Sequence, residues 1–551
     1  MATGRSLFAL ILIISLNCTF SSGQGIRFEA ENARLGGALK IMTTIPGYSG
    51  TGYVGQFEND ADILTFTVPV STGGNFNLYV GYAAPFGDKI NIVTINGNRS
   101  ELQFRNGNSF REAAFGKCRL NQGDNLVVIS KSWGWFLVDY IKIEPNTDPD
   151  IPFDISDTLV TPDPATFTVN EFHYLLDKFG KEIHSGVMDM KEAGWLQANT
   201  GKYPALLGLD LMNHTRNYSW FDKNILISEA REWYSKNGLL AVCWHWRDPL
   251  RKTEEFYTDR TTFDVSRITD TLSPEYLAMV SDIDIIAGYL KTLQQEEIPV
   301  LFRPLHEASG KWFWWGAKGP EPCKALWKLI FTRLTGKHQL KNLIWVWTTD
   351  AASDNLTWYP GNEYVDILGV DIYPPNGDFG SQILTFDKVR EVFKGKKMIT
   401  LSENGVIPDP ENLTADECRW SWFMTWSGDF TRNSAINPLD YWKRVLEHPY
   451  VITRDEMPDR NGPSSVNLIP ASPHPGKYRI VTESGQNCMI ISAVDQTREY
   501  TVSIFDLNGR ICAQFLHQAG GSEVSFMSPE RGIFIVRLIS GKLVENIKVA
   551  L

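Results

Sequence analysis

The sequence is poor in cysteine and has no excess of basic residues, and both absences exclude classes of protein. Only seven of its 551 residues are cysteine. None lies in a CxxC pair or a Cys/His cluster, which argues against a zinc site and a disulfide framework. With 53 basic and 64 acidic residues the formal net charge is −11. We therefore expect no basic face and no nucleic-acid partner.

Long apolar runs are also lacking, and no segment beyond the N-terminus is predicted to cross a membrane. Residues 1–23 are interpreted as a signal peptide, because Arg5 precedes an apolar stretch from Leu7 to Leu16. A stretch of about ten residues is too short to span a bilayer. Lipidation of Cys18 stays open, although Asn17 before it does not fit the usual small residue. The chain is expected to be secreted or displayed at the cell surface.

The length predicts several domains, and the composition divides the chain into three. Residues 25–146 alternate apolar and polar positions in short runs, which predicts a β-sandwich. Residues 147–164 are rich in Pro, Asp and Thr and predict a linker. Residues 466–551 are again β-rich, lack tryptophan and predict a small C-terminal β-sandwich, with Asn508-Gly509 as a hairpin turn.

The central region, residues 165–460, differs in holding all but two of the 18 tryptophans. Apolar strand-like runs alternate there with amphipathic stretches such as Pro274–Gln295 and Cys323–Thr335, which predicts a (β/α)₈ TIM barrel. The strand prediction is weakest for the eighth run, because its Trp, Phe and Met residues also suit a helix. The eight runs are Ile183–Val187, Ala205–Leu209, Leu239–Trp244, Pro299–Phe302, Leu343–Trp347, Ile367–Val370, Met398–Leu401 and Trp422–Thr425.

Carboxylates follow several of these runs, where a barrel places its active site. Glu307 follows the fourth run and Glu403 the seventh, so about three βα units separate them and they are expected to face each other. Two opposed carboxylates are what glycoside hydrolysis requires. Spacing alone leaves three aspartates as alternative candidates for the catalytic carboxylates: Asp210, Asp350 and Asp371.

The neighbouring residues suggest different roles for the two glutamates. Aromatic residues surround Glu307, and apolar walls raise a carboxyl pKa, as a general acid needs. Tyr373 is a possible hydrogen-bond partner that would keep Glu403 ionised. Trp312 and Trp426 offer flat faces for sugar rings, although tryptophan-rich stretches are more often core.

The central region resembles glycoside hydrolase family 26, mostly β-mannanases, in motifs spread over about half the chain. They are Trp244-His245-Trp246, Arg303 to Glu307 with Trp312 to Gly316, Gly369 to Pro374, Leu401-Ser402-Glu403 and Trp422 to Trp426. The resemblance implies a retaining endo-β-1,4-mannanase with Glu307 as acid/base, Glu403 as nucleophile and no catalytic cofactor. It also implies that Tyr373 orients Glu403 and that His245, His306, Trp312 and Trp426 contact the substrate.

The N-terminal region resembles carbohydrate-binding module family 35 in Phe28 to Asn32, Gly50 to Val54 and Phe136 to Ile141. That resemblance implies a structural Ca²⁺ held by Glu29, Glu31 and Asp139, whose hard oxygen ligands suit this ion. An ordinary exposed acidic edge is the alternative. Trp133 and Trp135 flank Gly134 and are candidates for a sugar platform or for packing.

The tail resembles a type IX secretion sorting domain in Val502 to Arg510, Arg531 to Leu538 and Lys548-Val549. This implies the secretion machinery as a partner.

A mannan-type polysaccharide is the expected substrate, and the protein is expected to be a monomer. The alternatives to an endo-β-1,4-mannanase are a mannobiose-releasing exo-mannanase, a lichenase, a β-1,3-xylanase, or a non-catalytic carbohydrate-binding protein. The presence of both motif glutamates argues against a non-catalytic protein.

Overall fold

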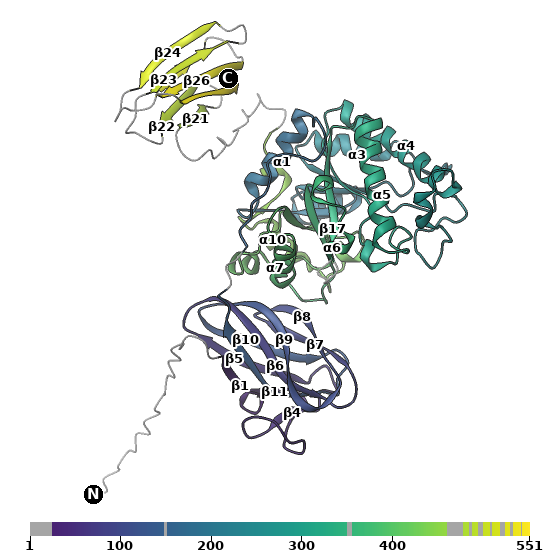
Figure 1. The fold of residues 1–551 in the computed structure, drawn as a ribbon, viewed down its shortest axis with the longest axis vertical. Coiled ribbons are helices and arrows are strands. Elements are labelled where there is room, and N and C mark those ends of the chain that lie inside the picture. The colour runs from purple at the N-terminus through teal and green to yellow at the C-terminus, as the bar shows by residue number, and fades with distance from the viewer. Residues whose placement is uncertain are drawn as a thin grey trace. The chain divides into compact units, whose positions relative to one another are not determined.

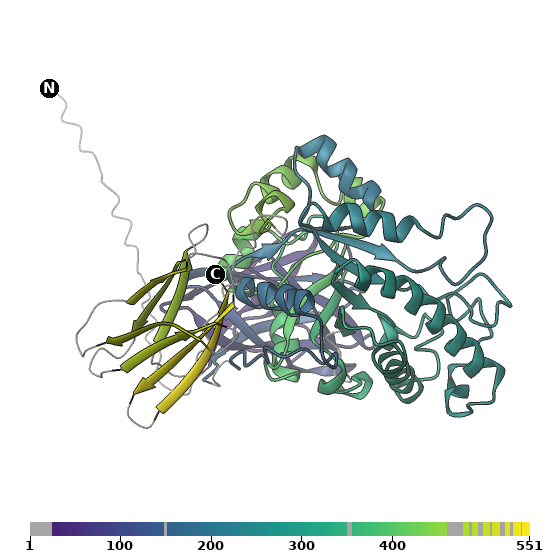
Figure 2. The same cartoon turned by 90° about the horizontal axis from the view of Figure 1, so that it is seen from above.

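The computed structural model describes residues 25–147, 151–349 and 355–459, and seven strands of the C-terminal region (Figures 1 and 2). Residues 1–24, with the expected signal peptide and Cys18, lie outside the described residues, as do Asp350 and the Asn508-Gly509 turn. Among the residues that are described, no helix is both long and apolar enough to cross a membrane.

The N-terminal region consists of two antiparallel sheets around one apolar core (Figure 1). Alternate side chains of Ile63–Val70 and Gly123–Lys131 point into this core, as the alternation in sequence predicts. The first sheet contains β1 (Ile26–Glu29), β3 (Lys40–Met42), β4 (Tyr53–Gly55), β6 (Gly74–Ala84), β9 (Gly107–Leu120) and β11 (Leu137–Pro145). The second contains β2 (Arg34–Leu35), β5 (Ile63–Val70), β7 (Lys89–Ile95), β8 (Asn98–Phe104) and β10 (Gly123–Lys131).

The central region is a parallel barrel whose strands follow one another in sequence order. They are buried almost throughout, which explains their continuous apolar runs. The strands are β13 (Gly186–Met188), β14 (Leu206–Asp210), β15 (Leu239–Cys243), β16 (Val300–Arg303), β17 (Leu343–Thr349), β18 (Ile367–Ile372) and β19 (Met398–Asn404).

The first and eighth predicted runs differ from regular strands. The first is broken into β12 (Ile183–His184), which pairs with β20 (Val451–Ile452), and β13. The eighth is an extended segment rather than a helix. In it Thr425 bridges both Val187 and Asn404, so the segment closes the barrel between its first and last strands.

Helices cover the outside of the barrel, among them α3, α4 and α5 (Figures 1 and 2). α4 has the predicted bounds, because Ser273 caps its N-terminus and Pro274 occupies its first turn. α5 begins three residues before the predicted start. The helices are α1 (Thr166–Lys178), α2 (Met190–Thr200), α3 (Ile225–Tyr234), α4 (Pro274–Gln295), α5 (Pro320–Thr332), α6 (Asn355–Trp358), α7 (Ile383–Val392), α8 (Pro410–Ala415), α9 (Asp429–Arg432) and α10 (Leu439–Leu446).

The described part of the expected linker, residues 151–164, contains no helix or strand. Its second half is attached to the barrel, since Val160 N–H donates to Asp366 and the Thr161 hydroxyl donates to the carbonyl of Leu343.

The described strands of the C-terminal region form two antiparallel sheets. One contains β21 (Tyr478–Glu483), β22 (Cys488–Ala493) and β25 (Val524–Met527), and the other β23 (Tyr500–Phe505), β24 (Ile511–His517), β26 (Ile533–Ser540) and β27 (Leu543–Ala550). β23 and β24 pair on either side of the predicted turn.

Candidate active site

Three carboxyl groups meet at the C-terminal ends of three barrel strands. Glu307 follows β16, Asp371 lies near the end of β18, and Glu403 lies near the end of β19. One oxygen from each lies within 4.8 Å of the other two. This end of a (β/α)₈ barrel is where catalytic groups gather, because the βα loops open there.

The backbone around Glu307 adopts an uncommon conformation. Leu305 and Glu307 both have left-handed φ angles, of 52° and 54°. Such conformations cost about 1–3 kcal/mol and persist when the surroundings enforce them. Trp315 contributes to this by donating its indole N–H to the carbonyl of His306 at 2.9 Å. The aromatic residues after Glu307 therefore help to position it as well as surround it.

Glu403 is buried and accepts hydrogen bonds on both carboxylate oxygens. Arg303 donates to Oε2 at 2.6 Å, and the hydroxyl of Tyr373 donates to Oε1. Burial and the charge of Glu403 raise the pKa of Tyr373 well above its ordinary value, so the phenol keeps its proton and stays a donor. The two donors fix the carboxylate in position.

Arg303 links Glu403 to Asp371. Its other terminal nitrogen donates to Asp371 at 2.8 Å, and Ser402 donates to the second oxygen of that carboxyl at 2.6 Å. Burial would lower the pKa of Arg303, but the charges of Asp371 and Glu403 outweigh this and hold it above its ordinary value. Burial and the charges of Glu403 and Glu307 raise the pKa of Asp371 well above its usual range.

Glu307 lies in the environment of a proton donor. Its pKa is raised, first by burial and second by the negative charge of Glu403. The indole N–H of Trp312 donates to its Oε2 at 2.8 Å and opposes part of this rise. A carboxyl group with a raised pKa keeps its proton closer to neutral pH, as a general acid must.

Two histidines and Asp210 form a hydrogen-bonded chain beside the carboxyl groups. Asp210 accepts from Nδ1 of His245 at 2.7 Å, and Nε2 of His245 lies 3.1 Å from Nε2 of His306. Burial, helped by His245 and Arg303, holds the pKa of His306 well below its ordinary value, so this ring is neutral.

The proton of His306 can be assigned from its surroundings. Among the residues that the structure covers, none bonds to its buried Nδ1. A proton on Nε2 instead gives every N–H an acceptor: His306 donates to His245, which donates to Asp210. Asp210 also accepts the backbone N–H groups of His245 and Met212, and these donors with His245 outweigh burial and lower its pKa.

The structure thus brings together the seven predicted residues of the catalytic centre. The ring of Trp426 lies 5.4 Å from that of His245, and Trp312 is half exposed beside Glu307. Of the rival aspartates, Asp371 joins the carboxyl cluster, and Asp210 is bound to His245. Arg303 has no predicted role in the site, although a charged residue at the end of an apolar strand is a usable signal for one.

The three carboxylates predicted to bind metal gather around one loop of the N-terminal region. Ser49 donates its N–H to Asp139 and its hydroxyl to Glu29, while Thr51 N–H donates to Glu31 at 2.5 Å. Burial first, with the charges of Glu29 and Glu31, raises the pKa of Asp139 to about 6. Oε2 of Glu31 is buried and has no partner in the described part of the chain. The three carboxylates do not form a group whose oxygens all lie within 4.8 Å of one another, and Glu29 and Asp139 share Ser49 as a hydrogen-bond donor.

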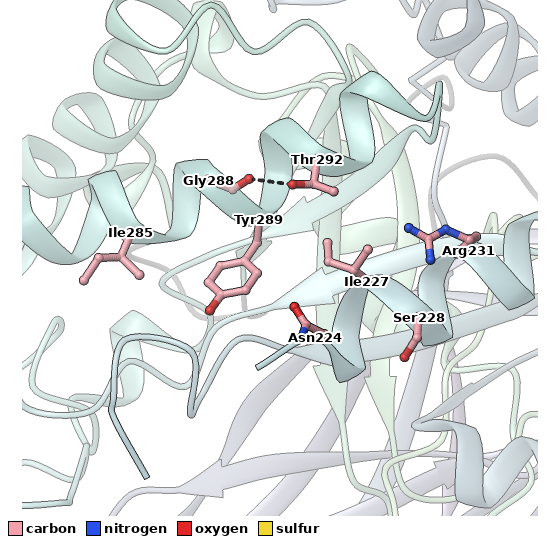
Figure 3. A pocket seen from close by; sticks show the side chains of 8 residues that line it. All are labelled: Asn224, Ile227, Ser228, Arg231, Ile285, Gly288, Tyr289 and Thr292. Atoms are coloured by element: carbon pink, nitrogen blue, oxygen red, sulfur yellow. Dashed lines mark hydrogen bonds between the residues drawn. The ribbon is translucent and has the colours of Figure 1, made fainter. Parts of the chain in front are cut away.

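A separate hollow lies between α3 and α4 on the outer helices (Figure 3). Asn224, Ile227, Tyr289 and Arg231 are among its lining residues, and it contains no carboxylate. It offers no acid/base pair and is not the catalytic centre.

A barrel in which Glu307 has a raised pKa and an oxygen of the hydrogen-bonded Glu403 lies within 4.8 Å of it has the arrangement of a glycoside hydrolase. The comparison with known families agrees with this class. Residues 160–456 match the model of glycosyl hydrolase family 26, and residues 26–146 match carbohydrate binding module family 35. The chain belongs to glycosyl hydrolase family 26 and carries a family 35 module.

Similar proteins extend over both regions. A mannan endo-1,4-beta-mannosidase of Thermothelomyces thermophilus is 37% identical over 442 residues, which cover 78% of this chain and 90% of that protein. A Podospora anserina GH26-CBM35 β-(1,4)-mannanase is 37% identical with a TM-score of 0.55, covering 78% of this chain and 98% of that one. A ruminal GH26 endo-β-1,4-mannanase is 28% identical with a TM-score of 0.58, covering 79% and 98%.

Proposed function

We propose that this protein is a retaining endo-β-1,4-mannanase that hydrolyses mannan, galactomannan or glucomannan. The observation that carries the proposal is the distance between Glu307 and Glu403, whose nearest oxygens lie within 4.8 Å. Retaining enzymes hold the two carboxyl groups about 5–5.5 Å apart, whereas inverting enzymes need about 6.5–9.5 Å for a water. The names of the similar proteins support mannan as the substrate.

In the first step Glu403 attacks the anomeric carbon while Glu307 gives its proton to the departing glycosidic oxygen. Arg303 and Tyr373 hold the attacking carboxylate in place. The new bond joins the sugar to Glu403 and the old bond breaks, leaving Glu307 ionised. His245, His306, Trp312 and Trp426 line the substrate site in this proposal.

In the second step Glu307 takes a proton from water, which attacks the anomeric carbon and releases Glu403. The electrostatics favour this change of role. The negative charge of Glu403 is one cause of the raised pKa of Glu307. That charge disappears while Glu403 is esterified to the sugar, so the pKa of Glu307 falls at the stage where it must act as a base.

The substrate is tested by reducing-sugar release from galactomannan, β-glucan and β-1,3-xylan. We expect galactomannan to be preferred. Activity on β-glucan or β-1,3-xylan alone would contradict the mannanase assignment. Glu403→Ala should abolish turnover, and near-wild-type turnover of this variant would contradict the role of Glu403. Product lengths from linear manno-oligosaccharides separate endo attack from release of mannobiose.

The N-terminal module is proposed to bind the same polysaccharide and to contain a structural Ca²⁺ held by Glu29, Glu31 and Asp139. The buried free oxygen of Glu31 and the raised pKa of Asp139 support a cation there. The exposed rings of Trp133 and Trp135 are a candidate sugar platform, with Trp135 packed edge-on against the exposed Phe86. Binding of the isolated module to insoluble mannan tests this role.

We further propose that the protein is secreted, with its C-terminal strands serving as a type IX sorting domain. The signal-like N-terminus and the motifs of Val502 to Arg510 support this. Deleting residues 466–551 should leave activity on galactomannan intact and retain the protein inside the cell. Export of the truncated protein would contradict the sorting role. We also propose that the protein is a monomer. Sedimentation velocity measures its oligomeric state.

A further inference from the structure

One buried carboxylate at the catalytic end of the barrel lies outside the cluster of Glu307, Asp371 and Glu403. Glu192 lies in the first turn of α2, and Asp189 alone separates this helix from the end of β13. The side chain of Glu192 is only 2% exposed. A buried carboxylate costs free energy unless charged or N–H donors compensate it, so the donors that face Glu192 indicate its role.

Glu192 binds the loop that follows the eighth segment of the barrel. Its Oε1 accepts the backbone N–H of Gly428 at 3.1 Å. Arg432 donates to both carboxylate oxygens, at 2.7 Å each. A bidentate pair of this kind fixes the orientation of the two groups as well as their distance. The carboxylate therefore holds both ends of α9, since Gly428 caps the start of this helix and Arg432 is its last residue.

The start of α2 leaves the carboxylate of Glu192 available for α9. Asp189 caps this helix by accepting the backbone N–H of Glu192 at 3.0 Å. In a capping box, a glutamate three residues after the cap bonds back to the backbone N–H of the capping residue. Here the N–H of Asp189 donates instead to the carbonyl of Gly208, at 2.9 Å. The usual local partner of Glu192 is thus bound elsewhere, and its carboxylate serves a contact between two loops.

α9 is a single turn of four residues that contacts two aromatic residues of the catalytic centre. Thr431 donates to the carbonyl of Trp426 at 2.9 Å, and the ring of Phe430 meets that of Tyr373 edge-on at 4.8 Å. A helix this short is not stable by itself in water, so contacts from elsewhere in the chain must hold it. The ion pair with Glu192 supplies the charged part of that support.

We propose that the ion pair of Glu192 and Arg432 positions the active site by holding α9 against Trp426 and Tyr373. This rests on the proposed mannanase function and assigns two positioning residues to it. If α9 shifts, Tyr373 loses the ring that packs against it, and Tyr373 is a donor to the nucleophile Glu403. The peptide of Trp426 loses a donor at the same time. The ion pair thus acts through α9 on both the attack by Glu403 and the binding of the sugar.

The first test uses Glu192→Gln, which keeps the shape of the side chain and removes its charge. The variant and the wild type are assayed for kcat and KM on mannopentaose, well below their melting temperatures. We expect kcat/KM to fall about tenfold, the size expected for one weakened hydrogen bond between charged groups. The misplaced Tyr373 should lower kcat, and the misplaced Trp426 should raise KM. Arg432→Lys keeps the charge and loses the forked guanidinium, so it should show the same changes and replaces Glu192→Gln if that variant does not fold.

A combination with Tyr373→Phe separates positioning from a general loss of stability. Groups that act through one another have effects that do not add. Tyr373→Phe should therefore lower kcat less in the Glu192→Gln background than in the wild type. Two independent losses that simply multiply would overturn the proposal, and so would a Glu192→Gln variant that keeps the wild-type kcat and KM.

Asp284→Asn provides the control. Asp284 accepts from Arg333 on both oxygens, at 2.6 Å each, in an ion pair between α4 and the end of α5. This variant should have a lower melting temperature and the wild-type kcat and KM, and an equal loss of kcat would overturn the positioning role. Wild-type activity on β-glucan or β-1,3-xylan alone would reject the mannanase function. The same ratios of variant to wild type, measured on that substrate, would still decide the role of the ion pair.

Discussion

The replacement Asp210→Asn tests the chain that runs from Asp210 through His245 to His306. Asparagine has nearly the same shape, and its oxygen can keep the backbone N–H groups of His245 and Met212. Its NH₂ group then faces Nδ1 of His245, where the carboxylate accepted at 2.7 Å. His245 must move its proton to Nε2, and that N–H points at the Nε2 proton of His306, 3.1 Å away. Two donors then face each other beside the catalytic carboxyl groups.

The size of the effect follows from the lost interaction. A hydrogen bond to a charged group contributes about 1.5–3 kcal/mol. If the misplaced imidazole costs the transition state this amount, kcat/KM falls about 10- to 150-fold. The measurement is steady-state hydrolysis of mannopentaose between pH 4 and 8 (roughly the range in which histidines and raised carboxyls titrate). The pH profile should change in shape as well as height, because the proton arrangement of the two histidines is altered.

Stability separates this positioning role from general damage to the barrel. The folded-state pKa of Asp210 lies below its unfolded value. The ionised carboxylate therefore adds to the free energy of unfolding above about pH 4, and this contribution is lost as the pH falls through the folded-state pKa. The difference in unfolding free energy between wild type and Asp210→Asn should therefore shrink in acid.

Asp366→Asn is the matched control. Asp366 is buried and accepts the N–H groups of Val160 and Trp345, each at 2.8 Å, just before β18 and away from the carboxyl cluster. It should lose stability and keep kcat. A positioning role for Asp210 is refuted if folded Asp210→Asn retains kcat/KM within about twofold of wild type, or if Asp366→Asn lowers kcat as much.

Three further predictions concern the proton donor, the nucleophile and the metal. Because the pKa of Glu307 is raised, kcat/KM should fall as the pH rises through it. This fall in kcat/KM at high pH should be absent with an aryl mannoside whose leaving group needs no proton. If the fall persists with that substrate, the titrating group is not Glu307. Tyr373→Phe removes one donor to Glu403 and should lower kcat about tenfold or more at an unchanged melting temperature, so a wild-type kcat would exclude an orienting role. Chelation of Ca²⁺ should lower the melting temperature of the N-terminal module by about 4 °C or more and leave that of the barrel unchanged. No change in a protein freed of metal would argue against the site.

Much of the fold could be read from local patterns. The parallel strands are buried on both sides and therefore appear as uninterrupted apolar runs, and α4 has the signals of Ser273 and Pro274 at its start. The eighth run was ambiguous, because no local pattern distinguishes an extended segment from a buried helix. Its form depends on Thr425 bridging the two edges of the barrel.

Glu307 and Glu403 could be chosen from the sequence, because their strand positions and motifs lie within short stretches of chain. Asp210 and Asp371 could not be distinguished from the catalytic pair this way, since their roles depend on partners far along the chain. Asp371 is bound to Arg303, and Asp210 lies against His245. Charge, burial and proton positions are properties of groups that meet in space, and only the folded barrel brings these groups within hydrogen-bonding distance.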